Sequence, residues 1–159
     1  MSAPTVRVLN DAQGVAEAAA DRVIEAATTA VAARGVFHLC TTGGSTPAAL
    51  YRALREPSRA DQMPWAKTQI WFGDDRFVPR VDPLSNVSPL DAQLLSPSAD
   101  GASSPLSPSA VHPWSTTAAD APTAVSAYLA ELRDAGLPHT QRGFPIFDLV
   151  LIGIGGDGH

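Results

Sequence analysis

The chain has 159 residues, 45% of them hydrophobic and 17% charged, with a formal net charge of -5 at pH 7. This size suits one hydrophobic core, so we expect residues 1–159 to form a single domain. The acidic balance and the lack of a Lys/Arg cluster argue against a nucleic acid or a membrane surface as a partner. Cys40 is the one cysteine, and no signal peptide or apolar span is recognisable, so we expect a cytoplasmic protein.

The first part of the chain alternates between strand and helix patterns. Residues 5–9 are a short β-rich run, and Asn10 with Gln13 resembles a capping box that begins a helix. Apolar residues at i+4 spacing mark its buried side: Val15, Ala19, Val23, Ala27 and Val31. Gly35 is typical of the residue that follows a helix, and residues 36–40 are predicted to form a buried strand.

The middle of the chain repeats this alternation. Pro47 is expected at the first position of a second helix, which follows the glycine loop TTGGST. Residues 68–72 are the next predicted strand, and residues 88–95 are predicted to form a short helix. Residues 96–110 are rich in Ser and Pro, and such a composition predicts a surface loop.

A third helix is expected from Ala121 to near Gly136, and residues 147–152 form the last predicted strand. The apolar stripe of this helix comprises Ala121, Val125, Tyr128 or Leu129, and Leu132. Apolar strands alternating with helices predict an α/β fold, with a mostly parallel, Rossmann-like sheet covered by helices on both faces. Because the last loop needs a following element to hold it, we expect the sheet to be incomplete at the C-terminus and truncated after the DGH motif.

Polar loops follow three of the predicted strands, at 43–47 (GGSTP), 73–76 (GDDR) and 153–159 (GIGGDGH). The carboxyl ends of parallel strands share one edge of a sheet, and ligands bind beyond that edge. We therefore expect the three loops to converge on one pocket.

The first loop has features that suit a phosphate group. Gly43 and Gly44 leave backbone N–H groups open to a ligand, Ser45 and Thr46 add hydroxyl donors, and a helix N-terminus follows. A Walker lysine is absent, so a nucleoside triphosphate is not expected. The alternative is structural: the glycines make a tight turn and Thr46 caps the helix.

The second loop offers two carboxylates and a guanidinium, from Asp74, Asp75 and Arg76. The alternative interpretation is a solvated surface ion pair. No histidine lies nearby at ligand spacing, so we predict no metal site.

The third loop contains G-x-G-x-x-G at 153–158, but no helix or acidic residue follows at the distance that a dinucleotide site requires. His159 is the more informative residue, because a histidine can accept a proton near neutral pH. Asp157 lies two residues before it and could orient it. We therefore interpret His159 as a candidate general base.

The other histidines and the cysteine are predicted to be structural. His38 and Cys40 lie within a predicted strand, where Cys40 is expected to be a core thiol. His112 and His139 lie beside prolines in predicted loops.

Four segments, in this order, together resemble one family: TTGGSTP at 41–47, WFGDDRFVP at 71–79, SNVSPL at 85–90 and DLVLIGIGGDGH at 148–159. They resemble the 6-phosphogluconolactonases, of the sugar-phosphate superfamily that includes glucosamine-6-phosphate deaminase. The resemblance covers nearly the whole chain. It implies hydrolysis of 6-phospho-D-glucono-1,5-lactone to 6-phosphogluconate, the second step of the oxidative pentose phosphate pathway, without a cofactor.

The resemblance also implies roles for single residues. It makes His159 the general base that activates water against the lactone carbonyl, with Asp157 orienting it. The phosphate or sugar contacts fall on Gly43, Gly44, Ser45 and Thr46. Its acidic-arginine motif falls on Asp74 and Arg76, with Arg76 directed at substrate oxygens, and Asn86 matches an asparagine that shapes the pocket.

Two departures from the family pattern stand out. Asp75 occupies a position where the family usually has glutamate, which leaves the role of that carboxylate open. Members also continue past DGH, so the chain is identified as an amino-terminal portion, and its activity alone is open. Two alternatives remain: a glucosamine-6-phosphate deaminase-like enzyme, although that family usually has a DEY-type segment where this chain has FGDDRFVP, and an inactive, truncated sugar-phosphate-binding fragment. The sequence does not indicate an oligomeric state.

Overall fold

The computed structural model describes residues 4–97, 101 and 103–154. Helices and strands alternate along these residues, as the sequence predicts. The helices are α1 (Ala12–Arg34), α2 (Ser45–Arg55), α3 (Pro57–Ala60), α4 (Ser88–Leu90) and α5 (Ala121–Asp134), with short 3₁₀ or π turns η1 (Trp65–Lys67), η2 (Asp91–Leu95) and η3 (Pro108–Ala110). The strands are β1 (Phe37–Thr41), β2 (Thr68–Phe72), β3 (Val111–His112) and β4 (Leu149–Val150).

The strands form one sheet in the order β3-β2-β1-β4, and all of its pairings are parallel. β1 and β2 pair along their whole length, from Phe37 opposite Thr68 to Thr41 opposite Phe72. The central strands are thus the longest, and the two short strands lie at the edges. The predicted parallel sheet is confirmed.

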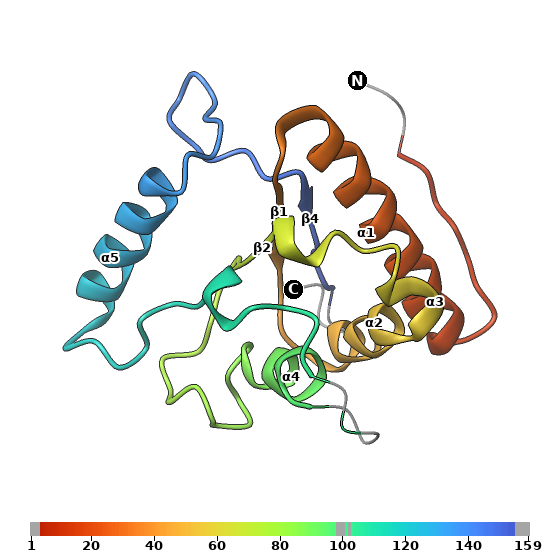
Figure 1. Ribbon diagram of the computed structural model, residues 1–159. Coiled ribbons are helices and arrows are strands. Elements are labelled where there is room, and N and C mark those ends of the chain that lie inside the picture. Colours follow the sequence, from red (N-terminus) through yellow and green to blue (C-terminus); the bar gives the residue numbers. More distant parts are fainter. Residues whose placement is uncertain (1–3, 98–100, 102, 155–159) are drawn as a thin grey trace.

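Helices cover the sheet from both sides (Figure 1). α1 and α2 lie on one side and α5 on the other. Successive strand residues point to opposite faces, so Leu39 and Ile70 join the core against α1 and α2, whereas Cys40 and Trp71 join the core that includes Tyr128 of α5. The prediction of helices on both faces is confirmed as well.

The beginning of α1 corrects the sequence prediction. Asp11, not Asn10, is the N-cap, and its side chain accepts a hydrogen bond of 2.8 Å from the amide N–H of Gly14. The buried residues of α1 are Ala16, Ala20, Val23, Ile24, Ala27 and Ala30. Val15 is 42% exposed, because residues spaced strictly four apart drift around a helix by about 40° per step. Gly35 ends the helix at φ 79°, as predicted.

Residues 5–9 do not form the predicted strand. Val6 and Val8 are 85% and 88% exposed, and no described strand pairs with this segment. A β-rich composition stabilises a strand chiefly through neighbours that pack against it, and here none is present among the described residues.

Smaller differences occur at other elements. α2 begins at Ser45, so Pro47 is its third residue, still within the first turn, where a missing N–H costs little. Residues 88–95 form α4 followed by a π-helical turn. Within 96–110, Leu106 is buried in the core, although the described residues around it are mostly irregular.

The buried side of α5 agrees with the predicted stripe at Tyr128 and Leu132 but has Ala124 in place of Ala121 and Val125. Ala124, Tyr128 and Leu132 are buried, whereas Val125 is 42% and Leu129 is 46% exposed. The sequence left Tyr128 and Leu129 as alternatives, and the structure selects Tyr128. In the part of the chain that the structure describes, no helix combines the length and the apolar character needed to cross a bilayer.

Candidate functional site

The strand ends bring two of the three polar loops side by side. The amide of Gly73 donates a hydrogen bond of 2.9 Å to the carbonyl of Thr41, which extends the β1–β2 ladder one step beyond the strands. On the other side of β1, the amide of Leu151 donates to the carbonyl of Cys40 at 2.8 Å, and Gly153 follows. All three loops therefore begin at the same edge of the sheet. Asp157 and His159 lie outside the described residues.

The first loop depends on a glycine at its junction with α2. Gly44 is the N-cap residue and has φ 104° and ψ -176°, a backbone conformation that side chains with a Cβ rarely adopt. No side chain caps the helix, so the alternative in which Thr46 caps it is wrong. The first N–H groups of α2 thus lack a side-chain acceptor.

A buried hydrogen bond holds this loop against its own helix. The hydroxyl groups of Thr41, at the end of β1, and Tyr51, in α2, lie 2.8 Å apart. Burial raises the pKa of Tyr51 to about 12, so its hydroxyl stays protonated and can donate at neutral pH. This hydrogen bond therefore joins the strand end before the loop to the helix that follows it, and so fixes the loop between them.

Gly43 makes a close contact with Asn86. A Cβ added to Gly43 would collide with the carboxamide of Asn86 and lie 2.9 Å from the Cβ of that residue. Asn86 is 6% exposed, and its Nδ2 donates a hydrogen bond of 3.0 Å to the carbonyl of Asp74. Asn86 therefore joins the first loop to the second, and only glycine fits at position 43.

A pocket of about 390 Å³ opens where these segments meet. Four of the predicted site residues line it: Gly44, Ser45, Arg76 and Asn86. The sequence analysis did not single out its other lining residues, which are Ala48, Pro83, Leu84, Ser85 and Pro89. Arg76 is the one charged residue among the described residues that line the pocket, so its charge favours an anion.

Three other predicted residues that the structure describes, Gly43, Thr46 and Asp74, do not line this pocket. Gly43 packs behind Asn86, and Thr46 lies in the first turn of α2. Asp74 lines a second pocket of about 300 Å³, whose apolar walls include Phe77 and Trp114. Asp74 and Arg76 thus line different pockets, although they are two residues apart in the chain.

The second loop is not the surface ion pair that the sequence left open as an alternative. Arg76 makes no ion pair with any residue that the structure describes, and Asp74 makes none either. Within the same residues, no group of three or more His, Cys, Asp or Glu side chains could hold a metal ion. The guanidinium of Arg76 therefore has no internal counter-charge in the described part of the chain.

The sequence did not predict the contacts of two residues beside the pocket, Asp75 and Ser85. Asp75 accepts hydrogen bonds from the amides of Arg76 and Asn86, and the hydroxyl of Ser85 also bonds to it. Nothing in the local pattern indicates this contact, since it joins positions ten and eleven residues apart. The quoted segment SNVSPL did contain Ser85, but only as part of a resemblance.

Two of the residues predicted to be structural, His38 and Cys40, are buried in the sheet. Nδ1 of His38 accepts a hydrogen bond of 3.1 Å from Nε1 of Trp71, and burial lowers the pKa of His38. Cys40 is buried in the core, as predicted, and this burial raises the pKa of its thiol to about 11.

The prediction that His112 lies in a loop is wrong. It is the last residue of β3, and its ring nitrogens lie 2.6 Å from Oε1 of Glu131 and 2.7 Å from Oε1 of Gln69. The proline that follows it does not interrupt the strand, because a short edge strand needs no further ladder bond there. His139 is exposed and forms an isolated bridge with Pro145.

Comparisons with known proteins agree on one family. Residues 10–159 match the family described as glucosamine-6-phosphate isomerases/6-phosphogluconolactonase. Among curated proteins, the chain is 35% identical to 6-phosphogluconolactonase of Streptomyces coelicolor, over 98% of this chain and 59% of that protein. It is 36% identical to 6-phosphogluconolactonase of Synechocystis, over 99% of this chain and 61% of that protein.

A solved structure extends the similarity to the fold. The crystal structure of 6-phosphogluconolactonase from Leishmania guyanensis superposes with a TM-score of 0.76 at 28% identity, covering 99% of this chain and 62% of that one. The chain therefore spans about three fifths of the length of the relatives that it matches. On its sequence and its fold alike, this chain belongs to the glucosamine-6-phosphate isomerase/6-phosphogluconolactonase family.

Proposed function

We propose that the full-length protein hydrolyses 6-phospho-D-glucono-1,5-lactone to 6-phosphogluconate. The observation that carries this proposal is the pocket that gathers Gly44, Ser45, Arg76 and Asn86 from separate loops at one sheet edge. The relatives named 6-phosphogluconolactonase support the choice of substrate. Since the chain spans about three fifths of their length, the activity of the whole protein is inferred from them.

The phosphate of the substrate is proposed to bind in this pocket. The guanidinium of Arg76 provides a charged donor with no internal partner among the described residues, and Ser45 provides a hydroxyl. The free N–H groups at the beginning of α2 add the positive end of the helix dipole. These three kinds of donor together suit a dianionic phosphate better than a neutral sugar.

Hydrolysis itself is proposed to depend on His159, with Asp157 orienting its ring. The imidazole takes a proton from water as the water oxygen bonds to the lactone carbonyl carbon. The bond between that carbon and the ring oxygen then breaks, and the ring oxygen leaves as a hydroxyl after taking up the proton. The remaining predicted contacts, Gly43, Thr46 and Asp74, are proposed to shape the sugar side of the site. The reaction needs no cofactor or metal.

A deaminase-like reaction on glucosamine 6-phosphate is the second candidate. The family description names both activities, and both substrates carry a phosphate that this pocket suits. The lactonase is favoured because the relatives that match the chain are named for it. An inactive fragment that only binds the sugar phosphate is the third candidate. A cytoplasmic location, where phosphorylated sugars occur, is also part of the proposal.

The experiment is a parallel assay of the full-length protein on the lactone and on glucosamine 6-phosphate. We expect hydrolysis of the lactone above its spontaneous rate, no release of ammonia, and a kcat lowered by about 10² to 10⁴ in His159→Ala. His139→Ala is the matched control, since His139 is exposed and remote in sequence, and it should retain full activity. Ammonia release would establish the deaminase, and activity of His159→Ala within about threefold of wild type would remove His159 from the mechanism.

A further inference from the structure

The carboxylate of Asp75 is fully engaged by its own chain. Its Oδ1 accepts hydrogen bonds from the amide of Asn86 at 2.7 Å and the amide of Arg76 at 2.8 Å. Its Oδ2 accepts a hydrogen bond of 3.2 Å from the hydroxyl of Ser85. Both oxygens therefore already have donors, and the side chain is half-buried.

These contacts reach the pocket through Arg76, Ser85 and Asn86, all of which line it. Asp75 fixes the backbone of Asn86, while the carboxamide of Asn86 bonds to the carbonyl of Asp74 and packs on Gly43. Asn86 lines the pocket, and Asp75 does not. A displacement of Asp75 would thus move one wall of the pocket without removing any residue that lines it.

Ser85 connects Asp75 to the turn before α4. Its side chain is buried, with the residue 2% exposed, and its Oγ accepts a hydrogen bond of 3.2 Å from the amide of Val87. α4 begins at the next residue and has no side-chain cap of its own. The turn that precedes α4 is therefore held by Ser85, and Ser85 is held by Asp75.

Asp74 provides the contrast within the same loop. It is exposed, and its carboxylate makes no hydrogen bond or ion pair with a residue that the structure describes. Both aspartates line the second pocket, but among the described residues only the carboxylate of Asp75 has hydrogen-bond donors. The two carboxylates therefore have different surroundings, although they are adjacent in the chain.

We propose that Asp75 is a positioning residue: it sets Asn86 and the backbone of Arg76 in the phosphate pocket and does not itself touch the substrate. The proposal rests on the proposed function for the identity of the ligand. The sequence left the role of this carboxylate open. In the proposed role, the hydrogen bonds that Asp75 accepts are needed and its negative charge is not.

The test compares Asp75→Ala with Asp75→Asn in the full-length protein. Asparagine can keep all three contacts, because its Oδ1 can accept both amides and its Nδ2 can donate to the hydroxyl oxygen of Ser85. We expect Asp75→Ala to raise KM for the lactone at least about tenfold while kcat changes less than about threefold, and Asp75→Asn to recover most of the loss. Equal losses of kcat in both variants would show that the charge takes part in the reaction, and an unchanged KM in Asp75→Ala would overturn the positioning role.

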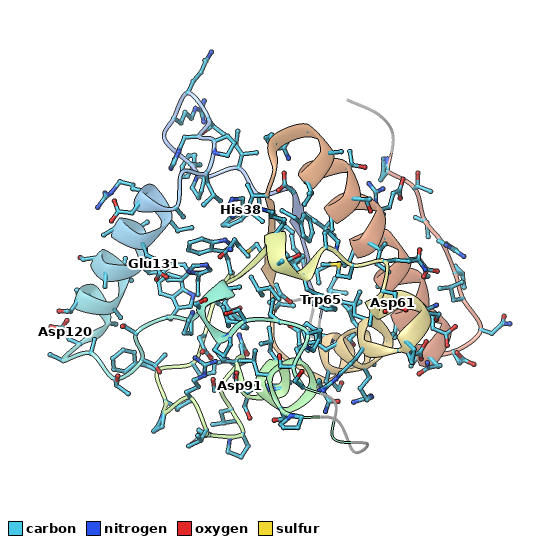
Figure 2. All side chains as sticks on the ribbon, in the orientation of Figure 1. His38, Asp61, Trp65, Asp91, Asp120 and Glu131 are labelled. Atoms are coloured by element: carbon cyan, nitrogen blue, oxygen red, sulfur yellow. The ribbon has the colours of Figure 1, made fainter. Side chains whose placement is uncertain are left out.

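Two further variants separate positioning from general loss of stability. Asp120→Ala removes a carboxylate that caps α5 by accepting a hydrogen bond of 2.8 Å from the amide of Thr123 (Figure 2). This variant should lower Tm without changing KM. In Gly43→Ala the added methyl group collides with the side chain of Asn86, so this variant should displace Asn86 and raise KM as Asp75→Ala does. A normal KM in Gly43→Ala would remove Asn86 as the link.

Hydrogen exchange at the amide of Asn86 gives a readout that does not depend on turnover. Its protection should be lost in Asp75→Ala and kept in Asp75→Asn, and equal protection in the two would overturn the proposal. If the wild-type protein hydrolyses no lactone, the proposed function fails, while this measurement still decides whether Asp75 holds Asn86.

Discussion

The two faces of the sheet are held to their helices by different means. The α1 face, where Phe37, Leu39 and Ile70 meet α1 and α2, is packed mainly with aliphatic side chains. The α5 face, where Trp71 meets Tyr128 and Leu132, is joined by aromatic rings and directed hydrogen bonds. Figure 2 shows His38 near the sheet and Glu131 on α5, two polar side chains on the α5 side.

The hydrogen bonds of the α5 face converge on β2. Trp71 bonds to His38 and stacks on His112, with ring centroids 3.9 Å apart. Beside it, the hydroxyl of Tyr128 bonds to both the amide and the carbonyl of Phe72, each at 3.0 Å, and Nε1 of Trp114 donates to the same carbonyl. Phe72 is the last residue of β2, so the α5 face fixes the point from which the loop with Asp74 to Arg76 departs.

We infer that the α1 face contributes most of the stability, whereas the α5 face fixes the position of the strand end. Apolar packing tolerates changes that conserve volume, whereas hydrogen bonds to a strand end tolerate no change of direction.

The largest effect is expected on the α1 face, in Phe37→Ala. Phe37 is fully buried, so the variant loses the transfer free energy of the ring and leaves a cavity, at a cost of about 3–5 kcal/mol. Urea unfolding of the full-length protein measures the change. Phe37→Leu, which keeps most of the volume, is the control and should cost less than about 1.5 kcal/mol. A similar loss in both variants would mean that this face also requires a particular shape.

A smaller effect is expected on the α5 face, in Tyr128→Phe. The change keeps the ring but removes the hydroxyl that pairs with the backbone of Phe72, at a cost of about 1–3 kcal/mol in the free energy of unfolding. Tyr51→Phe is the matched control, since that hydroxyl bonds only to Thr41 in the contacts described here and to no strand backbone.

Tyr128→Phe should also affect the site. Because Phe72 leads into the loop of Arg76, Tyr128→Phe should raise KM for the lactone. An unchanged KM in Tyr128→Phe would show that the α5 face does not position this loop, and the comparison between the faces would fail.

The smallest effect is a dependence of stability on pH through His38. Burial is the main cause of its lowered pKa, and its Nδ1 must be unprotonated to accept the hydrogen bond from Trp71. The unfolded chain therefore binds a proton at a higher pH than the native protein does. The contribution is fully present above pH 6.5, the ordinary value, and is lost as the pH falls through the lowered pKa.

Urea unfolding between pH 7.5 and pH 5 checks this sign. One group can contribute a slope of at most about 1.4 kcal/mol per pH unit. In His38→Asn, the carboxamide oxygen can still accept from Trp71 and does not titrate, so the slope assigned to His38 should vanish. An equal fall in the variant and in wild type would show that the pH dependence does not come from His38.

The sequence by itself determined the elements whose signals are local. Apolar runs of strand length and glycine loops before helices predicted β1, β2 and a parallel sheet, because periodicity and turn chemistry act within a few residues. The same local signals identified Gly44, Ser45 and Arg76, which the structure brings to one pocket. The N–H groups at a helix N-terminus favour anions, and the local sequence predicts where that terminus lies.

Strand pairing and side-chain hydrogen bonds between residues distant in the sequence are set by the tertiary structure. Residues 5–9 have strand composition but no neighbouring strand among those described, and His112 lies in β3 because β2 is beside it. The sequence allowed a surface ion pair in the loop of Asp75, whereas in the structure this side chain accepts hydrogen bonds from residues ten and eleven positions away. A side chain's hydrogen-bonding groups are known from the sequence, but which partners reach them is set by the packing of elements that only the folded chain brings together.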